Sequence, residues 1–167
     1  MAASLASEMQ LDDETVENIR LAGRLHDIGK IGIREHILNK PGRLTPEEYE
    51  HVKEYARIGM EILQPLTHLG PVLDYVRDHA ERPDGRGYPR GITDGEINIG
   101  ARIVGASDVF DALTSPRAHR APMTVDEALA YLGGAQGSAI AGDVYAALVR
   151  VVTERRTLVF LQEAPPA

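Results

Sequence analysis

Apolar side chains recur every three or four residues along most of the chain, which is the spacing of one face of an α-helix. This periodicity predicts helices over residues 16–28, 46–63, 71–80, 97–113, 125–132 and 143–153. The Thr157–Gln162 stretch allows a short C-terminal strand. Because no internal repeat or heptad accompanies the helices, the pattern indicates an all-α helical bundle.

Turn and cap residues indicate where the helices begin and end. Thr45–Glu48 and Thr124–Glu127 each match the capping box that starts a helix. Gly29 closes the first predicted helix, so we expect the His26-Asp27 pair in its last turn. The segment over residues 82–91 is dense in Gly and Pro, and it is too rigid and specific in composition for a linker.

The amino-acid composition limits the kinds of site that the chain can form. The chain has 167 residues, which favours one domain, and its lack of Cys excludes disulfides and thiolate metal sites. Any metal must therefore be held by His, Asp, Glu or water. The net charge of -7 argues against binding to DNA or to anionic membranes as the main activity. No stretch reads as a membrane span or signal peptide, so we expect a cytoplasmic protein.

The strongest local chemical signal is His26-Asp27 followed by Lys30. An imidazole and a carboxylate near a helix end suit a divalent metal, and a lysine one turn later suits a phosphate oxygen beside it. The alternative is a His–Asp pair that caps a surface turn without binding anything.

Two further residues have both a functional and a structural interpretation. Asp108 lies inside the helix over 97–113, which is apolar almost all round and is therefore expected at the centre of the bundle. A buried carboxylate there must bind a metal or find a partner such as Arg102. His79, at the end of its helix, is either a ligand or a solvated histidine interacting with the helix dipole.

Taken in order, five motifs resemble the HD-GYP family over about Leu5 to Val149. They are His26-Asp27-Ile28-Gly29-Lys30, Ile37-Leu38-Asn39-Lys40-Pro41-Gly42, Asp84-Gly85-Arg86-Gly87-Tyr88-Pro89, Ala101-Arg102-Ile103, and Asp108-Val109-Phe110-Asp111-Ala112-Leu113-Thr114-Ser115. The resemblance implies an HD-domain bundle over residues 1–155 with an ordered GYP loop, and a C-terminal tail over 156–167. It also implies a metal-dependent phosphodiesterase that hydrolyses cyclic di-GMP or a related cyclic dinucleotide, commonly as the output domain of a response regulator behind a receiver or sensor domain.

The resemblance also implies roles for individual residues. The metal ligands would be His26, Asp27, His79 and Asp108, holding Fe or Mn, with Lys30 and Asp27 acting in catalysis. The residues that touch the nucleotide would be Gly87, Tyr88, Pro89, Arg117 and Arg120.

The chain departs from the family pattern around the same pocket. Tyr55 and Ala80 stand where the family has metal-binding histidines, and His51 is one candidate to compensate. Ala118-His119 and Ile140-Ala141-Gly142 replace a Pro-Tyr and a Phe-Asp-Pro, and a family histidine about thirty residues before the His-Asp pair falls outside this sequence. The alternative function is therefore a catalytically impaired module that binds a nucleotide or a signalling protein and regulates without turnover.

Overall fold

The chain folds into a bundle of α-helices. The computed structural model describes residues 1–116 and 121–163, with the side chains of the last helix described as far as residue 154. The α-helices are α1 (Ala2–Glu8), α2 (Asp13–Leu25), α3 (Glu35–Leu38), α4 (Pro46–Leu63), α5 (Val72–Asp78), α6 (Ile99–Thr114), α7 (Val125–Gly133) and α8 (Gly142–Glu163), with 3-10 helices η1 (Ile28–Gly32) and η2 (Thr67–Leu69). Within the described ranges there is no sheet, only isolated bridges. The all-α prediction is confirmed.

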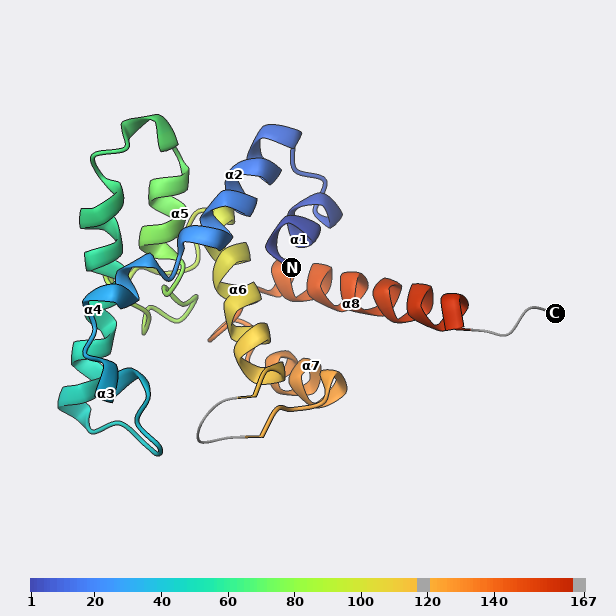
Figure 1. Cartoon of the computed structure of the whole chain (residues 1–167). Helices are drawn as coiled ribbons and strands as arrows, with labels where there is room; N and C mark the ends of the chain where they lie inside the picture. The colour runs from blue at the N-terminus through green and yellow to red at the C-terminus, as the bar shows by residue number, and fades with distance from the viewer. Residues whose placement is uncertain (117–120, 164–167) are drawn as a thin grey trace.

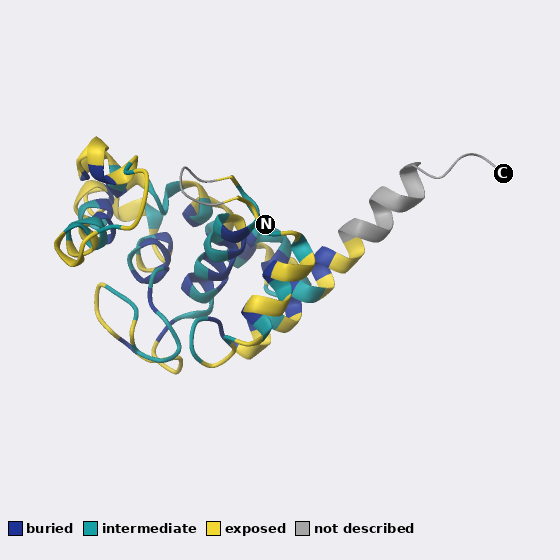
Figure 2. Ribbon diagram, turned by 90° about the horizontal axis from the view of Figure 1, so that it is seen from below, coloured by how far each residue is buried: buried dark blue, intermediate teal, exposed yellow. Residues whose placement is uncertain are grey.

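Helix α6 lies in the middle of the bundle, with α4 and α5 to one side and α8 to the other (Figure 1). It packs against α1, α2, α5, α7 and α8. Its buried residues are Gly100, Ala101, Ile103, Val104, Ala106, Ser107, Phe110 and Leu113. Figure 2 shows buried positions gathered on the helix faces that point inward. The predicted central, buried helix is therefore confirmed.

The predicted helix starts are found where the sequence places them. Thr45 and Thr124 each accept a hydrogen bond from the backbone of the third residue into the helix, and Glu48 and Glu127 complete both capping boxes. The end of α2 differs from the prediction, because α2 stops at Leu25 and a 3-10 turn follows. The His26-Asp27 pair therefore lies at a junction between two helices rather than within a helical turn.

The first helix was not predicted from the sequence, because polar residues are frequent over residues 1–13. Helix α1 buries Ala2, Leu5 and Ala6 in the main core beside α2, α6 and α8. Leu5 and Ala6 are fully buried. The signal was present in the spacing of Ala2, Leu5, Ala6 and Met9, but a helix of seven residues gives too short a window for periodicity to stand out.

The prediction of a short strand over 157–162 is wrong, because these residues continue α8. No Gly or Pro occurs between Asp143 and Ala164, so a helix that has started has nothing to stop it. Extending an existing helix adds one hydrogen bond per residue, whereas a lone strand lacks a partner. Among the described helices, none combines the length and apolar character needed to cross a membrane.

Two glycines set how closely the elements around the centre approach. A Cβ atom on Gly29 would lie 1.9 Å from the Tyr55 carbonyl oxygen, so η1 touches the backbone of α4. A Cβ atom on Gly105 would lie 2.2 Å from the His79 carbonyl oxygen, so α6 touches the end of α5. Any larger side chain at either position would push two elements apart.

We expect Leu5→Ala to lower the free energy of unfolding by about 2–5 kcal/mol, because it opens a cavity in the main core. Urea denaturation monitored by circular dichroism measures this change. The matched control is Leu66→Ala at a 42%-exposed leucine, which should cost within about 0.5 kcal/mol. Equal effects of the two substitutions would show that α1 contributes nothing to the core.

Candidate functional site

Three acceptor groups converge where η1 meets α6. His26 is the C-cap of α2, Asp27 is the N-cap of η1, and Asp108 lies in the middle of α6. His26 Nε2 lies 3.4 Å from Asp27 Oδ1 and 3.6 Å from Asp108 Oδ1. These distances are too long for good hydrogen bonds. The fold thus brings His26 next to Asp108, 82 positions later in the chain, and groups three residues that the family resemblance assigns to one site.

The tautomer of His26 decides what this cluster needs. Its Nδ1 lies 2.9 Å from the Gly23 carbonyl oxygen, which can only accept, so Nδ1 carries the proton. In a neutral ring Nε2 then presents a lone pair to two carboxylates. Both His26 Nε2 and Asp27 Oδ1 are buried without a hydrogen-bond partner. Three acceptors that face one another are stable only with a proton or a cation between them.

Without a cation, a proton on His26 relieves this repulsion. Burial alone would lower the pKa of His26, but the carboxylates of Asp108 and Asp27 outweigh it and raise the pKa above its ordinary value. Burial opposes ionisation of Asp108, yet the neighbouring His26 outweighs burial and holds the pKa of that carboxyl below its usual range. A divalent cation would satisfy the same acceptors with more charge.

Lys30 adds a positive charge beside the three acceptors. Its Nζ lies 2.6 Å from Asp27 Oδ2 and 5.5 Å from the centre of the Tyr55 ring. Asp27 therefore presents one oxygen to the lysine and keeps the other, Oδ1, toward His26. The ammonium group is about one-third exposed, so it remains within reach of a bound ligand.

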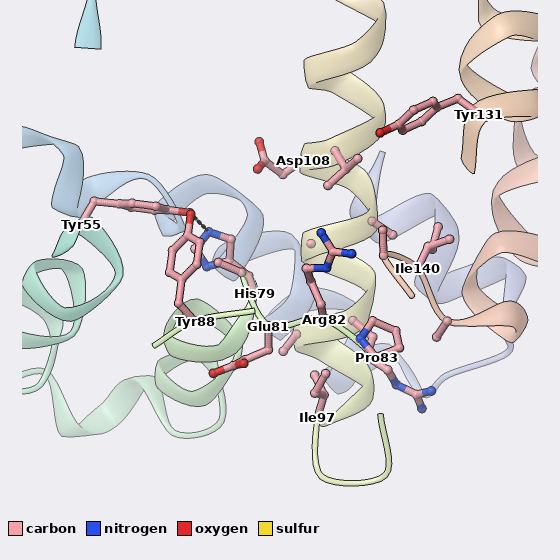
Figure 3. Close-up of a pocket in the computed structure, with 18 residues that line it drawn as sticks. Tyr55, His79, Glu81, Arg82, Pro83, Tyr88, Ile97, Asp108, Tyr131 and Ile140 are labelled. Atoms are coloured by element: carbon pink, nitrogen blue, oxygen red, sulfur yellow. Dashed lines mark hydrogen bonds between the residues drawn. The ribbon is translucent and has the colours of Figure 1, made fainter. Parts of the chain in front are cut away.

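His79 is buried beside the same centre. It is 3% exposed, which rules out the solvated interpretation, and its ring lies 5.1 Å from that of His26, edge to face. Its Nδ1 is 2.7 Å from the Val76 carbonyl oxygen, and its Nε2 is 2.7 Å from the Tyr55 hydroxyl. Figure 3 shows Tyr55 reaching His79 with Tyr88 alongside. Burial raises the pKa of Tyr55 and lowers that of His79, so both groups stay neutral.

The Gly- and Pro-rich loop brings Tyr88 to this aromatic group. The Tyr88 ring lies 6.1 Å from the Tyr55 ring, and the Tyr88 backbone N–H donates to the Ala80 carbonyl oxygen at 3.2 Å. At Gly87 a Cβ atom would lie 2.3 Å from the backbone of Glu81, so a larger residue would push the loop away. Burial raises the pKa of Tyr88 to about 12. The phenol therefore stays protonated and can donate a hydrogen bond.

Glu81 holds the loop in this position, a role that sequence reasoning missed. Its carboxylate accepts hydrogen bonds from the backbone N–H groups of Arg90 (2.5 Å), Gly91 (3.1 Å) and Ile92 (3.2 Å). Asp78, also buried, pairs with Arg77 and Arg90 and fixes the loop at the same end. The signal available in the sequence was an acidic residue directly before a segment rich in glycine, whose free N–H groups need acceptors.

Several sequence hypotheses do not hold. Arg102 does not pair with Asp108, but approaches Asp94 at 3.3 Å and Asp143 at 3.4 Å. His51 does not compensate for a missing ligand, because it pairs with Glu54 and lines a different cleft from His26. Arg117 and Arg120, with Ala118-His119, lie outside the described residues.

Asp108 lies where three clefts meet. A cleft of about 490 Å³ is lined by Lys30, Lys40, Tyr55 and Tyr88. A second, of about 510 Å³, opens beside His26 and is lined by two arginines of α2, Arg20 and Arg24. A third, of about 260 Å³, runs from Tyr55 and His79 toward α7 and is the one drawn in Figure 3. Asp108 can thus be approached by a ligand from more than one cleft.

The chemical types of the donors suit a divalent cation. In the described part of the chain, however, no group of three or more His, Asp or Glu side chains is arranged so that it could hold a metal ion as it stands. Even so, His26 Nε2 and Asp27 Oδ1 are buried acceptors with no hydrogen-bond partner, and the Asp108 carboxylate faces them. One imidazole and two carboxylates suit Fe, Mn, Zn or Mg. His79 does not join this set, since its Nε2 is bonded to Tyr55.

Comparison with known proteins identifies related sequences. A family model described as HD domain matches residues 1–144. A cyclic di-GMP phosphodiesterase of Thermotoga maritima is 39% identical over 158 residues, covering 92% of this chain and 42% of that protein. A 3'3'-cGAMP-specific phosphodiesterase of Vibrio cholerae is 36% identical over 148 residues, covering 89% of this chain and 32% of that protein. The chain thus spans less than half the length of each of these relatives.

A solved structure shares the fold. The HDG"Y"P protein Bd1817 of Bdellovibrio bacteriovorus superposes with a TM-score of 0.74 at 19% sequence identity. The match covers 90% of this chain and 48% of that protein. At this identity the likeness concerns the arrangement of helices.

We expect Glu81→Ala to lower the free energy of unfolding by about 2–3 kcal/mol, because three backbone N–H groups lose a charged acceptor. Trypsin should also cleave the loop faster, at its arginines. Glu96→Ala is the matched control, since that exposed glutamate accepts from Thr93 in the same region. A loop equally resistant to trypsin in both variants would contradict the anchoring role of Glu81.

Proposed function

Because the chain belongs to the HD-domain family, within its HD-GYP members, we propose that it is a metal-dependent phosphodiesterase that hydrolyses cyclic di-GMP or a related cyclic dinucleotide. The observation that carries this proposal is the set of facing acceptors. His26 Nε2 and Asp27 Oδ1 are buried without a partner beside Asp108, and a site of this kind requires positive charge. The Thermotoga maritima and Vibrio cholerae relatives are both named as phosphodiesterases of cyclic dinucleotides.

The proposed metal site uses His26, Asp27 and Asp108, with Fe or Mn as the expected ion. A divalent cation bound there supplies Lewis-acid polarisation of a phosphoryl oxygen. His26 is oriented for this role by the hydrogen bond from its Nδ1 to the Gly23 carbonyl, which leaves Nε2 as the donor atom. Asp27 is oriented by its bond to Lys30 in the same way.

Lys30 and Tyr88 are proposed to act on the substrate directly. The ammonium group of Lys30, adjacent to Asp27, would neutralise charge on a phosphoryl oxygen as it develops. Tyr88 lines the same cleft as Lys30, where its protonated phenol can donate a hydrogen bond and its ring can pack against a base. Gly87 and Pro89 fix where Tyr88 stands. The roles of Arg117 and Arg120 in gripping phosphates rest on the family resemblance.

A second candidate function is favoured by one specific observation. Among the described residues of this centre, the hydrogen bond from Tyr55 to His79 leaves His26, Asp27 and Asp108 available to a metal. A weakly loaded centre would bind a cyclic dinucleotide, or a signalling partner, without hydrolysing it. In that case the chain would act as a regulator. Binding of the nucleotide would be transmitted to a partner through the loop that carries Tyr88.

The wider setting of the domain is proposed on the same grounds. An upstream receiver or sensor domain would make this chain the output of a signalling protein. Its assignment as one HD-GYP unit over residues 1–155 with a tail over 156–167 stays a prediction, as does its cytoplasmic location.

We expect protein purified without chelator to contain Fe or Mn, and to hydrolyse cyclic di-GMP when either metal is supplied without oxygen. Asp108→Asn should lower Mn²⁺ affinity by about 10-fold or more and reduce turnover, because it removes a charged donor. Metal analysis and chromatography of the nucleotide products measure both effects, with 3'3'-cGAMP as the second substrate.

The matched control is Asp13→Asn, at an exposed carboxylate in the first turn of α2, which should leave metal content and turnover as in the wild type. Full turnover by Asp108→Asn would refute the proposed centre. Nucleotide binding without turnover in metal-loaded wild-type protein would support the regulatory function instead.

A further inference from the structure

Both ring nitrogens of His79 are engaged by the protein itself. The Val76 carbonyl oxygen, 2.7 Å from Nδ1, can only accept, so Nδ1 carries the proton. In the neutral ring, Nε2 therefore holds the lone pair, and the Tyr55 hydroxyl at 2.7 Å must be the donor. A metal ion needs the same lone pair. In the folded protein, the hydrogen bond from Tyr55 therefore occupies the lone pair through which His79 would bind a metal ion.

Water cannot easily take over this hydrogen bond. Tyr55 is 5% exposed and His79 is 3% exposed, so a broken bond would leave two buried polar groups without solvent. Leaving such groups unsatisfied is unfavourable, so the bond between the two side chains is retained. The Tyr55 backbone is also held in place, because η1 touches its carbonyl group at Gly29. The phenol is therefore positioned by the packing of α4 as well as by its hydrogen bond.

His79 nevertheless lies close enough to matter to the centre. Its ring contacts that of His26 at 5.1 Å between centroids, and Asp108 lines the same cleft. The imidazole is thus adjacent to the facing acceptors but directs its lone pair to a phenol. The Tyr55 hydroxyl thus decides whether His79 can join His26, Asp27 and Asp108 as a fourth donor.

We propose that Tyr55 limits the metal capacity of this chain: by donating to His79 Nε2, it withholds that imidazole and leaves a weak site for a single cation at His26, Asp27 and Asp108. This inference rests on the proposed metal centre and adds the residue that sets its donor number. Tyr55 here is a positioning residue, since it acts through His79 and does not bind the metal.

The test removes a single oxygen atom. Tyr55→Phe keeps the ring and its edge contacts with His79 (5.6 Å) and Tyr88 (6.1 Å), but frees Nε2. Titration of the metal-free full chain with Mn²⁺, followed by calorimetry and by the paramagnetic resonance of free Mn²⁺, gives affinity and stoichiometry. We expect Tyr55→Phe to bind Mn²⁺ about 10-fold more tightly than the wild type, the scale on which changes around metal ligands act.

Two further variants tie the gain to His79. Tyr75→Phe, at another buried tyrosine, is the matched control and should bind Mn²⁺ as the wild type does. In the double variant Tyr55→Phe/His79→Ala the gain should disappear, with circular dichroism confirming that the helical fold is retained. If Tyr55→Phe binds Mn²⁺ no more tightly than the wild type, or keeps its gain without His79, the proposal is wrong.

Spectroscopy distinguishes a Tyr55 that withholds His79 from the metal from a Tyr55 that binds the metal itself. Ferric iron bound by a tyrosinate absorbs visible light through charge transfer, so wild-type protein loaded with iron and oxidised should lack such a band. A band that is present in the wild type and lost in Tyr55→Phe would overturn the proposal, since Tyr55 would then be a ligand. If no variant binds Mn²⁺, the metal centre itself fails. If the wild type binds and Tyr55→Phe gains nothing, only the role of Tyr55 fails.

Discussion

The site depends on backbone contact at two glycines. At Gly29 the 3-10 turn that follows Asp27 lies against the Tyr55 carbonyl group, and at Gly105 helix α6 lies against the carbonyl group of His79. These contacts have no room for a Cβ atom, so they set the spacing of four elements at once. With that spacing, a histidine and an aspartate from one junction reach Asp108 on the central helix. A slightly wider approach would leave the same side chains in separate hydrogen-bond networks.

This geometry also concentrates negative charge in a chain that is already acidic, with a net charge of -7. The ammonium group of Lys30 offsets the negative charge on one oxygen of Asp27. The raised pKa of His26 favours its protonated form, which offsets part of the remaining carboxylate charge. The hydrophobic core around α6 holds the groups in place despite their repulsion. Folding energy from apolar packing therefore maintains an arrangement that electrostatics alone would disperse.

The features that could be predicted from the sequence are those that depend on residues close together in the chain. Capping boxes at Thr45 and Thr124, the apolar residues around Asp108 and the His26-Asp27 pair can be recognised locally. The grouping of that pair with Asp108 was implied by the family resemblance. The Tyr55–His79 bond joins residues 24 positions apart, and no local pattern encodes it. The anchoring by Glu81 depends on how the loop returns, and the extension of α8 depends on helix propagation overcoming weak strand propensity.

The carboxylate of Glu81 closes a loop whose ends are nine residues apart, in the manner of a cyclised peptide. In a cyclised ligand most of the conformational entropy is lost before binding, so association need not supply it. Tyr88 stands within this closed segment, already ordered against the Ala80 carbonyl group. Recognition through Tyr88 should therefore carry a small loop-ordering entropy, and binding at this loop would depend on temperature mainly through the surface that it buries.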